Sequence, residues 1–204
     1  MVELTSRVRG VMVRSWVARV SLMYVLSRLL SGGLMLAFAA IQGPTWYSGA
    51  HPDYVTFANI WDARWYMYIA SAGYPSTLPL DATGHVTQNA WAFLPVYPFL
   101  VGGIAALTHV SWSAVAVAVS LLAGWGFMLV LYRLMSRRLT PAQSTWAIVF
   151  ACVAPAAPLF GVGYAEALYL LLLALALLTL AVRLHLQRPR ARGGGAGRAL
   201  LRHD

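Results

Sequence analysis

The 204-residue sequence contains no lysine, one cysteine and only six acidic residues. The single cysteine, Cys152, excludes an internal disulfide and a metal site built from several cysteines. Charged residues make up 10% of the chain and hydrophobic residues 60%, whereas about a quarter of the residues in soluble domains are charged. Several apolar runs approach the ~20 residues that cross a bilayer. The composition therefore predicts an integral membrane protein.

The formal net charge is +9, and all 15 basic residues are arginine. All but Arg64 fall into three groups that flank apolar runs, at residues 7–28, 133–138 and 183–202. An excess of positive charge is typical of cytoplasmic loops of membrane proteins. The grouping therefore indicates a membrane topology, and we expect the lipid bilayer, not nucleic acid, as a partner.

The order of polar and apolar segments predicts an all-α membrane protein with three parts. Residues 1–19 are expected to form a basic cytoplasmic amphipathic segment, residues 20–184 a transmembrane domain, and residues 185–204 a disordered basic tail. The first apolar run is too long for the core of a cleavable signal peptide, so we expect it to be retained as a span. The predicted spans are residues 20–42, 112–132, 145–162 and 168–182.

The apolar run at residues 90–108 decides the topology. If it crosses, the arginines at 133–138 lie on the opposite side from the N-terminus; if it does not, all three groups share one side. Pro95 and Pro98 interrupt helical hydrogen bonding and favour a bent interfacial or re-entrant segment. We therefore predict four crossings, cytoplasmic termini and a large outer loop at 43–111. Arg28 is expected to snorkel toward the inner surface.

The stretch Trp61–Ala70 concentrates an acid, an arginine and aromatic residues between apolar segments. Read as a helix, it belongs to a polar stripe formed by Asn59, Asp62, Tyr66 and Gly73. The neighbouring face is aromatic and carries Trp61, Trp65 and Tyr68, as in helices that lie at lipid headgroups. Two interpretations remain open: a surface helix that presents one functional carboxylate, or an interfacial anchor whose Asp62 is merely solvated.

Glu166 is the second candidate, apart from this stripe at the start of the last apolar run. An ionisable residue in or near a span is by default a functional candidate, but an acid there also interacts favourably with its own helix dipole. The five histidines are scattered, and none forms a pair at a helical ligand spacing. We predict no metal site and no cofactor, while dependence on a divalent metal stays open.

Three motifs, in this order, resemble the PIG-V family of mannosyltransferases and its bacterial relatives. They are WDxxWYxxIAxxGY at 61–74, FLPxYP at 93–98 and YAEAL at 164–168, and the resemblance extends over roughly residues 21–184. It implies the GT-C fold, a bundle of transmembrane helices whose large first outer loop carries interfacial helices and the catalytic acid. It also implies transfer of mannose from a polyprenyl- or dolichyl-phosphate-mannose donor to a glycan or glycolipid acceptor outside the cytoplasm.

On this resemblance Asp62 is the candidate general base of an inverting transfer. The candidate substrate-binding residues are Trp61, Arg64, Trp65, Tyr66, Tyr97, Tyr164 and Glu166. Arg64 could contact the donor phosphate or snorkel to lipid headgroups. Trp61, Trp65 and Tyr97 could stack on the sugar or prenyl chain, or belong to an aromatic belt.

The sequence departs from the family in two ways. Ala165 and Ala167 stand where the family commonly has serine, and the chain resembles only the N-terminal half of such proteins. Two interpretations follow: the chain is a truncated form that is inactive alone, or a partner chain supplies the further spans. The alternative is a non-enzymatic membrane subunit, or half of a transporter, that binds a lipid-linked sugar; a transporter predicts inverted repeats, and we find no repeat.

Overall fold

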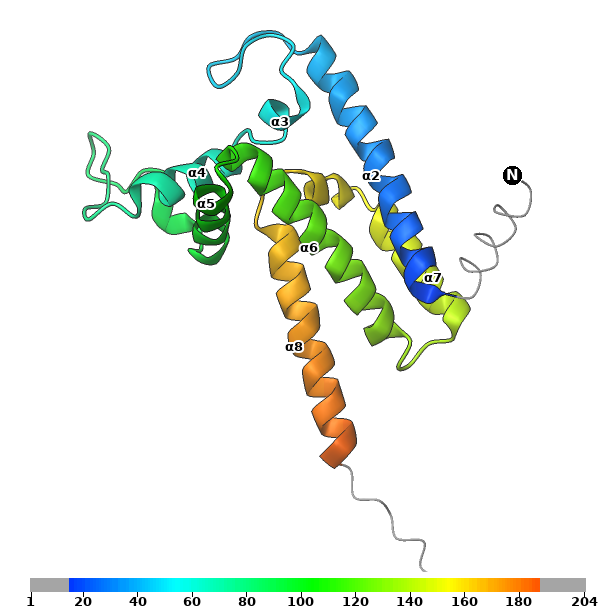
Figure 1. Ribbon diagram of the computed structural model, residues 1–204. Coiled ribbons are helices and arrows are strands. Elements are labelled where there is room, and N and C mark those ends of the chain that lie inside the picture. Colours follow the sequence, from blue (N-terminus) through cyan, green and yellow to red (C-terminus); the bar gives the residue numbers. More distant parts are fainter. Residues whose placement is uncertain (1–14, 188–204) are drawn as a thin grey trace, which may run out of the picture.

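The structure is a computed structural model that describes residues 15–187. These residues form helices joined by loops, and their only strand-like pairing is an isolated bridge between Leu80 and Val86. The prediction of an all-helical chain is therefore confirmed for this part (Figure 1). The elements are α2 (Trp16–Ile41), α3 (Tyr54–Phe57), α4 (Asp62–Ala72), η1 (Ala90–Ala92), α5 (Val96–Thr108), α6 (Trp112–Met135), α7 (Pro141–Val153), η2 (Ala157–Gly161) and α8 (Glu166–Gln187).

Three of the described helices are long and apolar enough to span a membrane: α2, α6 and the part of α8 from Glu166 to Leu184. The chain is thus a membrane protein. The predicted span at 145–162 is instead the 13-residue helix α7 followed by the short 3₁₀ turn η2. A 13-residue helix is ~20 Å long, whereas the hydrocarbon core is ~30 Å thick. Pro155 and Pro158 explain the break, since proline lacks the N–H that continues a helix.

The helix α2 runs antiparallel to α6, and three contacts fix their register. The rings of Trp16 and Tyr132 stack with centroids 5.1 Å apart. The Trp125 indole N–H donates to Ser21 Oγ at 2.9 Å. In the third contact the Tyr24 hydroxyl of α2 donates to the Leu121 carbonyl of α6 at 2.8 Å. The level of a residue of α2 along α6 can therefore be inferred from these three pairs.

The segment 43–111 gathers at the end of the bundle where α6 and α8 begin (Figure 1). The helix α5 stays at this end. Near its start, the Tyr97 hydroxyl donates to the carbonyl of Ala116, one turn into α6, at 2.9 Å. After its last residue, Thr108, only three residues separate it from α6. Both ends of α5 thus lie near the first turns of α6, and α5 does not run the length of the bundle.

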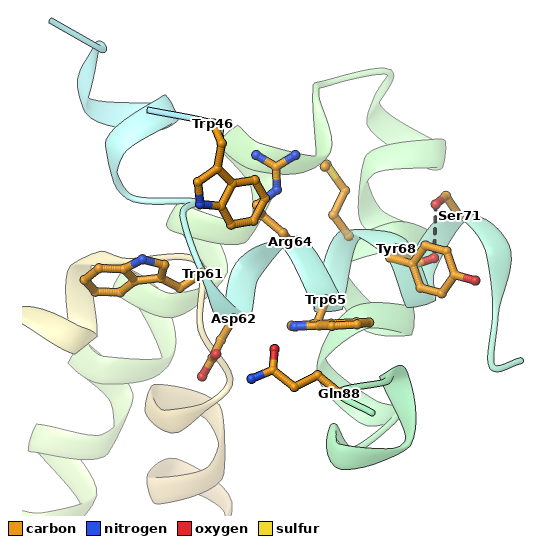
Figure 2. A pocket seen from close by; sticks show the side chains of 9 residues that line it. Trp46, Trp61, Asp62, Arg64, Trp65, Tyr68, Ser71 and Gln88 are labelled. Atoms are coloured by element: carbon orange, nitrogen blue, oxygen red, sulfur yellow. Dashed lines mark hydrogen bonds between the residues drawn. The ribbon is translucent and has the colours of Figure 1, made fainter. Parts of the chain in front are cut away.

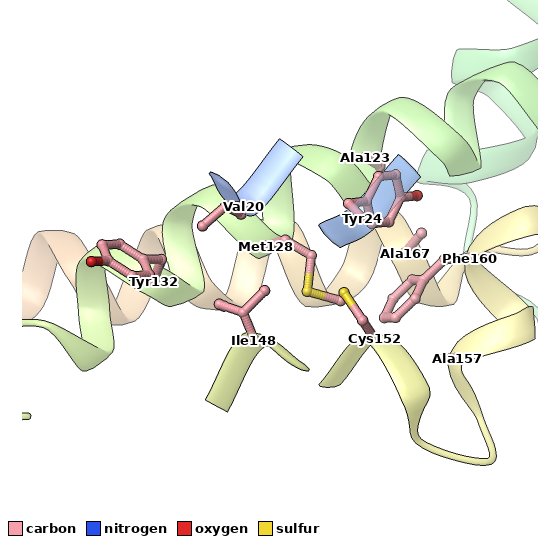
Figure 3. Packing of buried hydrophobic residues seen from close by; sticks show 10 residues of the cluster. All are labelled: Val20, Tyr24, Ala123, Met128, Tyr132, Ile148, Cys152, Ala157, Phe160 and Ala167. Atoms are coloured by element: carbon pink, nitrogen blue, oxygen red, sulfur yellow. The ribbon is translucent and has the colours of Figure 1, made fainter. Parts of the chain in front are cut away.

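The main apolar core lies between α2, α6, α7, η2 and α8 (Figure 3). Met128 on α6 and Ile148 on α7 are fully buried there, and Tyr24 of α2 and Phe160 of η2 pack around them. Between membrane helices such side chains stabilise the bundle through van der Waals packing, because lipid chains are as apolar as the side chains themselves. This core holds η2, and with it the start of α8, against α6.

Arg28 lies away from the surface on which the sequence placed it. It is four residues further along α2 than Tyr24, so it lies near the first third of α6, toward the end that carries α3 and α4. Its guanidinium donates to the carbonyls of Cys152 and Ala157, where α7 ends and η2 begins. The expectation that Arg28 snorkels to the other end is therefore wrong, because backbone carbonyls at the break between α7 and η2 accept hydrogen bonds from its guanidinium instead.

Two predicted boundaries also shift. The helix α2 already begins at Trp16, capped by Ser15, so its first turns belong to the segment expected to be a separate amphipathic helix. The remainder of that segment, residues 1–14, lies outside the described residues. At the other end α8 continues to Gln187, past the predicted boundary at 184. The rest of the tail, residues 188–204, also lies outside the described residues.

Candidate active site

The helix α4 carries the candidate base, and its local backbone determines where that residue lies. Trp61, immediately before the helix, has φ 51° and ψ −113°, a conformation that L-residues rarely adopt. This sharp turn starts the helix at Asp62, and Gly73 with φ 75° ends it. The predicted polar stripe is therefore wrong: Asn59 precedes the turn, Tyr66 is buried, and Gly73 follows the helix.

The buried face of α4 carries Ala63, Tyr66 and Ile69. The ring of Tyr66 packs edge-on against the rings of Phe93 and Tyr97, with centroids 5.2 and 5.1 Å away. The hydroxyl of Tyr97 in turn lies 2.9 Å from Ser120 Oγ as well as from the Ala116 carbonyl. These edge-on aromatic contacts thus fix α4 to α5 and α6, and they leave Asp62 on the exposed face.

Asp62 lies where two adjoining clefts meet (Figure 2). The larger cleft has a volume of about 660 Å³ and is lined by Trp46, Trp61, Asp62, Arg64, Trp65, Met67, Tyr68, Ser71 and Gln88. The smaller has a volume of about 220 Å³ and shares Asp62, Trp65 and Gln88 with it. Among these lining residues Asp62 is the one carboxylate. Its side chain and that of Gln88 point into the same space beside Trp65.

Arg64 points to the opposite side of α4 from Asp62 (Figure 2). Its guanidinium donates to the carbonyl of Tyr47 at 2.9 Å and lies over the ring of Trp46, 5.7 Å from the centroid. Arg64 is exposed and still lines the larger cleft. The cation and the carboxylate therefore occupy two separate parts of the site, and each is available to a different group of a ligand.

The start of α8 forms the floor beneath α4. The backbone N–H of Gly163 donates to the carbonyl of Ala58 at 2.9 Å, and the hydroxyl of Tyr164 donates to the carbonyl of Ile60 at 3.2 Å. These bonds bring the third motif against the residues that immediately precede α4. Glu166, which the sequence set apart from the polar stripe, is thereby placed close to Asp62.

The charges of both acids affect the pKa values of two tyrosines, Tyr66 and Tyr164. Burial, together with the charges of Glu166 and Asp62, raises the pKa of Tyr66 to about 12. Burial and the charge of Asp62 likewise raise the pKa of Tyr164 to about 12. The two carboxylates therefore act on the same pair of tyrosines. Glu166 Oε2 is buried and has no hydrogen-bond partner among the described residues.

The predicted site residues divide into two layers. Trp61, Asp62, Arg64 and Trp65 line the larger cleft. The other four lie beneath it and do not line it: Tyr66, Tyr97, Tyr164 and Glu166. Tyr97 is only 2% exposed and both of its hydroxyl contacts are internal, so its placement gives it a role in packing and not in stacking on a ligand.

Sequence reasoning missed Trp46 and Gln88, which the fold of the outer loop brings to the cleft. Trp46 could have been noticed as an aromatic residue just beyond the end of a span, where such residues are enriched. Gln88 gave no signal, because it lies in irregular chain between a bridge and a 3₁₀ turn. Among the described residues no group of three or more His, Cys, Asp or Glu side chains could hold a metal ion.

The arrangement suits a ligand that combines flat apolar faces with hydroxyl groups. Tryptophan and tyrosine rings supply apolar walls, and a few polar groups fix orientation, as in most small-molecule sites. An exposed carboxylate within such walls can accept a proton from a ligand hydroxyl. Comparisons of the chain with models of protein families, with curated proteins and with solved structures gave no match.

Proposed function

We propose that this chain is a glycosyltransferase subunit that moves mannose from a polyprenyl-phosphate-mannose donor to a glycan or glycolipid acceptor outside the cytoplasm. The resemblance of its three motifs to the PIG-V family suggests the donor and the sugar. One structural observation carries the proposal: a single carboxylate, Asp62, lies in an aromatic cleft at the end of an apolar helical bundle. A lipid-linked sugar and a polar acceptor could meet at such a place.

In the proposed reaction Asp62 is the general base. An acceptor hydroxyl attacks the anomeric carbon while its proton passes to the Asp62 carboxylate. The bond between the anomeric carbon and the phosphate oxygen breaks, and the lipid phosphate leaves with the electron pair. Attack from the face opposite the leaving group inverts the anomeric centre, as in single-displacement carbohydrate enzymes. The leaving group is already good, so the protein has to position the acceptor and remove its proton.

The other residues have proposed roles that follow from their positions. Arg64, directed away from Asp62, would contact the donor phosphate, which is a favourable charge-assisted pairing. Trp61 and Trp65 would form the walls for the sugar. Tyr66, Tyr97, Tyr164 and Glu166 would hold α4 from below.

We further propose four crossings with both termini in the cytoplasm, in which α7 and η2 together make the crossing that α7 alone is too short to make. Charge separation along the bundle supports this proposal. Arg133 lies over the ring of Trp16, and Arg137 donates to the carbonyl of Ala181, so these two arginines lie where α6 and α8 end, whereas Arg28 and Arg64 lie toward the other end. The described acids lie in or beside the segment at the opposite end: Asp53, Asp62, Asp81 and Glu166. Arginine-rich ends face the cytoplasm under the positive-inside rule, so the cleft would open to the other side.

Substitution of Asp62 by asparagine tests the proposal. Asparagine keeps the shape of the side chain but cannot accept the proton, and loss of a general base typically costs 10²–10⁴-fold in rate. The measurement is incorporation of radiolabelled mannose from polyprenyl-phosphate-mannose in membranes that contain this chain and any partner chain it needs. Protein amount is checked in parallel. Asp62→Asn that keeps most of the activity would contradict the mechanism.

Asp53→Asn and Asp81→Asn are matched controls. Hydrogen bonds from Thr56 lower the pKa of Asp53, and those from Thr83 and His85 lower the pKa of Asp81. A lowered pKa makes each carboxylate a weaker base, so both variants should retain activity. If no form transfers mannose but the chain still binds the donor, the function is instead that of a non-enzymatic subunit. Direct use of a nucleotide sugar would indicate a different class of enzyme.

A further inference from the structure

A second cavity lies between α2 and α6. It shares no lining residue with the two clefts at Asp62. We call it the α2–α6 groove; its volume is about 740 Å³. It follows α2 from Ser21 to Leu36, which corresponds to ~22 Å of helix. One leaflet contributes about half of the ~30 Å hydrocarbon core. The groove is therefore long enough for a lipid headgroup and the first part of one hydrocarbon chain.

The walls of the α2–α6 groove are apolar and open to the surrounding lipid. Leu29 and Leu122, from opposite walls, are 68% and 64% exposed. The polar side chains in the walls are already bonded within the protein: the Tyr24 hydroxyl to the Leu121 carbonyl, and the Tyr54 hydroxyl to the Gly161 carbonyl. The groove therefore offers a hydrocarbon chain contact along its length and requires no polar atom from it.

Arg28 is the one charged residue that lines the groove. Within the described part of the chain, its hydrogen-bond partners are neutral oxygens, those of Ser27, Cys152 and Ala157. Its other close contacts are the rings of Tyr24 and Phe160, with centroids 5.4 and 5.6 Å away. No carboxylate of the described residues pairs with it. The groove thus holds a full positive charge that its own walls do not neutralise.

The chain leaves space beside this charge. Gly32 and Gly33 follow Arg28 by one turn of α2 and also line the groove. A Cβ atom on Gly33 would meet nothing within 4 Å, and one on Gly32 would meet only Tyr54 Cε2, at 3.8 Å. The register with α6 places Arg28 near the first third of that helix, close to the level of α3. A headgroup entering from the α3 end could therefore reach the guanidinium.

We infer that the α2–α6 groove binds an anionic membrane phospholipid. Its phosphate lies beside Arg28, in the space left by Gly32 and Gly33, and the first part of one acyl chain lies along the ~10 Å of α2 between Arg28 and Ser21. Charge complementarity selects the anionic headgroup, and the exposed apolar walls select the chain. The inference concerns a resident lipid and does not depend on the proposed transferase activity.

Native mass spectrometry of the purified full chain tests the inference. The protein is exchanged into detergent that contains phosphatidylglycerol or phosphatidylcholine with identical acyl chains. We expect retention of phosphatidylglycerol in preference to phosphatidylcholine. Arg28→Gln should weaken phosphatidylglycerol binding about tenfold, the effect of losing one charge-assisted hydrogen bond, and should abolish the preference. Arg133→Gln, which removes an arginine from the other end of the bundle, should change neither.

Gly33→Leu provides a second variant that does not disturb the bonds of Arg28. A Cβ atom at residue 33 meets no protein atom within 4 Å, so we expect the leucine variant to fold normally, to fill the space beside Arg28 and to lose binding of the lipid. Ala40→Leu adds a similar side chain to an exposed position of α2 outside the groove and should bind as the parent does. Equal retention of both lipids, or unchanged binding by Gly33→Leu, would overturn the inference. So would a preference for a polyprenyl phosphate over phosphatidylglycerol, since the groove would then hold the donor.

Discussion

The backbone N–H of Gly163 donates to the carbonyl of Ala58 across 2.9 Å. This bond joins the segment that precedes α8 to the segment that precedes α4, although more than 100 residues separate them in the sequence. The close approach requires glycine at 163, because a Cβ there would overlap the Asn59 side chain and lie 3.1 Å from Ala116 Cβ. Two carboxylates of distant motifs, Asp62 and Glu166, meet as a result.

Gly163→Ala should therefore destabilise the protein. Forcing an extra methyl group into a filled space typically costs about 1–3 kcal/mol, so we expect a lower midpoint of thermal unfolding in detergent. Gly103→Ala is the control, because a Cβ at Gly103 in α5 meets nothing within 4 Å. Alanine in a helix is favoured over glycine by about 0.5–1 kcal/mol, so the control should be slightly more stable. A midpoint for Gly163→Ala at or above that of the parent would contradict this packing.

The backbone at Trp61 predicts an unusual ranking of two variants. With φ 51° and ψ −113°, residue 61 is in a region that glycine adopts freely and alanine does not. Both Trp61→Gly and Trp61→Ala remove the indole, which is 63% exposed, so they differ mainly in backbone strain. We expect Trp61→Gly to be more stable than Trp61→Ala by about 1–3 kcal/mol. Equal unfolding midpoints, or a more stable alanine variant, would show that the turn before α4 is not strained.

The two buried tyrosines beneath α4 predict a loss of stability at alkaline pH. The pKa of each is raised to about 12, whereas a tyrosine in an unfolded chain has a pKa of about 10. Between pH 10 and 12 the unfolded state therefore binds fewer protons than the folded state, and stability falls as pH rises. Each tyrosine contributes up to about 1.4 kcal/mol per pH unit.

Unfolding of the parent and of Tyr66→Phe, measured in detergent at pH 8, 10 and 11, checks this. The two proteins should show similar changes between pH 8 and 10. Above pH 10 the midpoint of Tyr66→Phe should fall less steeply, because phenylalanine has no proton to lose. Parallel pH dependence of the two proteins over the whole range would argue against burial of the Tyr66 hydroxyl.

Cysteine labelling in a Cys152→Ala background tests the proposed four-crossing topology. Ser76, in the outer loop, and Ser136, after α6, are both exposed. An impermeant thiol reagent added to intact cells should label Ser76→Cys and not Ser136→Cys, whereas both should react after the membrane is permeabilised. Labelling of both variants in intact cells, or of Ser136→Cys alone, would refute the four-crossing arrangement.

Much of the fold could be predicted from the sequence because hydrophobic length is a strong signal. The long spans α2, α6 and α8 follow from apolar runs, and the break after α7 follows from Pro155 and Pro158. The prediction of the polar stripe was wrong mainly because of the backbone at Trp61. A helical period assumes continuous helical backbone, and Trp61 departs from it, so Asn59 and Asp62 do not share a helix face.

The remainder of the site depends on long-range contacts that periodicity cannot show. Glu166 reaches Asp62 because Gly163 permits close packing, and Gln88 reaches the cleft through an irregular loop. Arg28 was expected at one end of the bundle from charge grouping alone. Its true neighbours are backbone carbonyls, which are present in every residue and leave no trace in a sequence.

The pairing of Arg28 with the broken end of α7 has a consequence for biosynthesis. Peptide carbonyls without partners are costly in hydrocarbon, so a 13-residue helix that ends inside the bilayer needs a donor from another segment. Because α2 precedes α7 in the chain, we expect its guanidinium to be in the membrane before Cys152 and Ala157 are inserted. We therefore expect α7 to insert into the membrane beside α2 and not as an isolated helix in lipid.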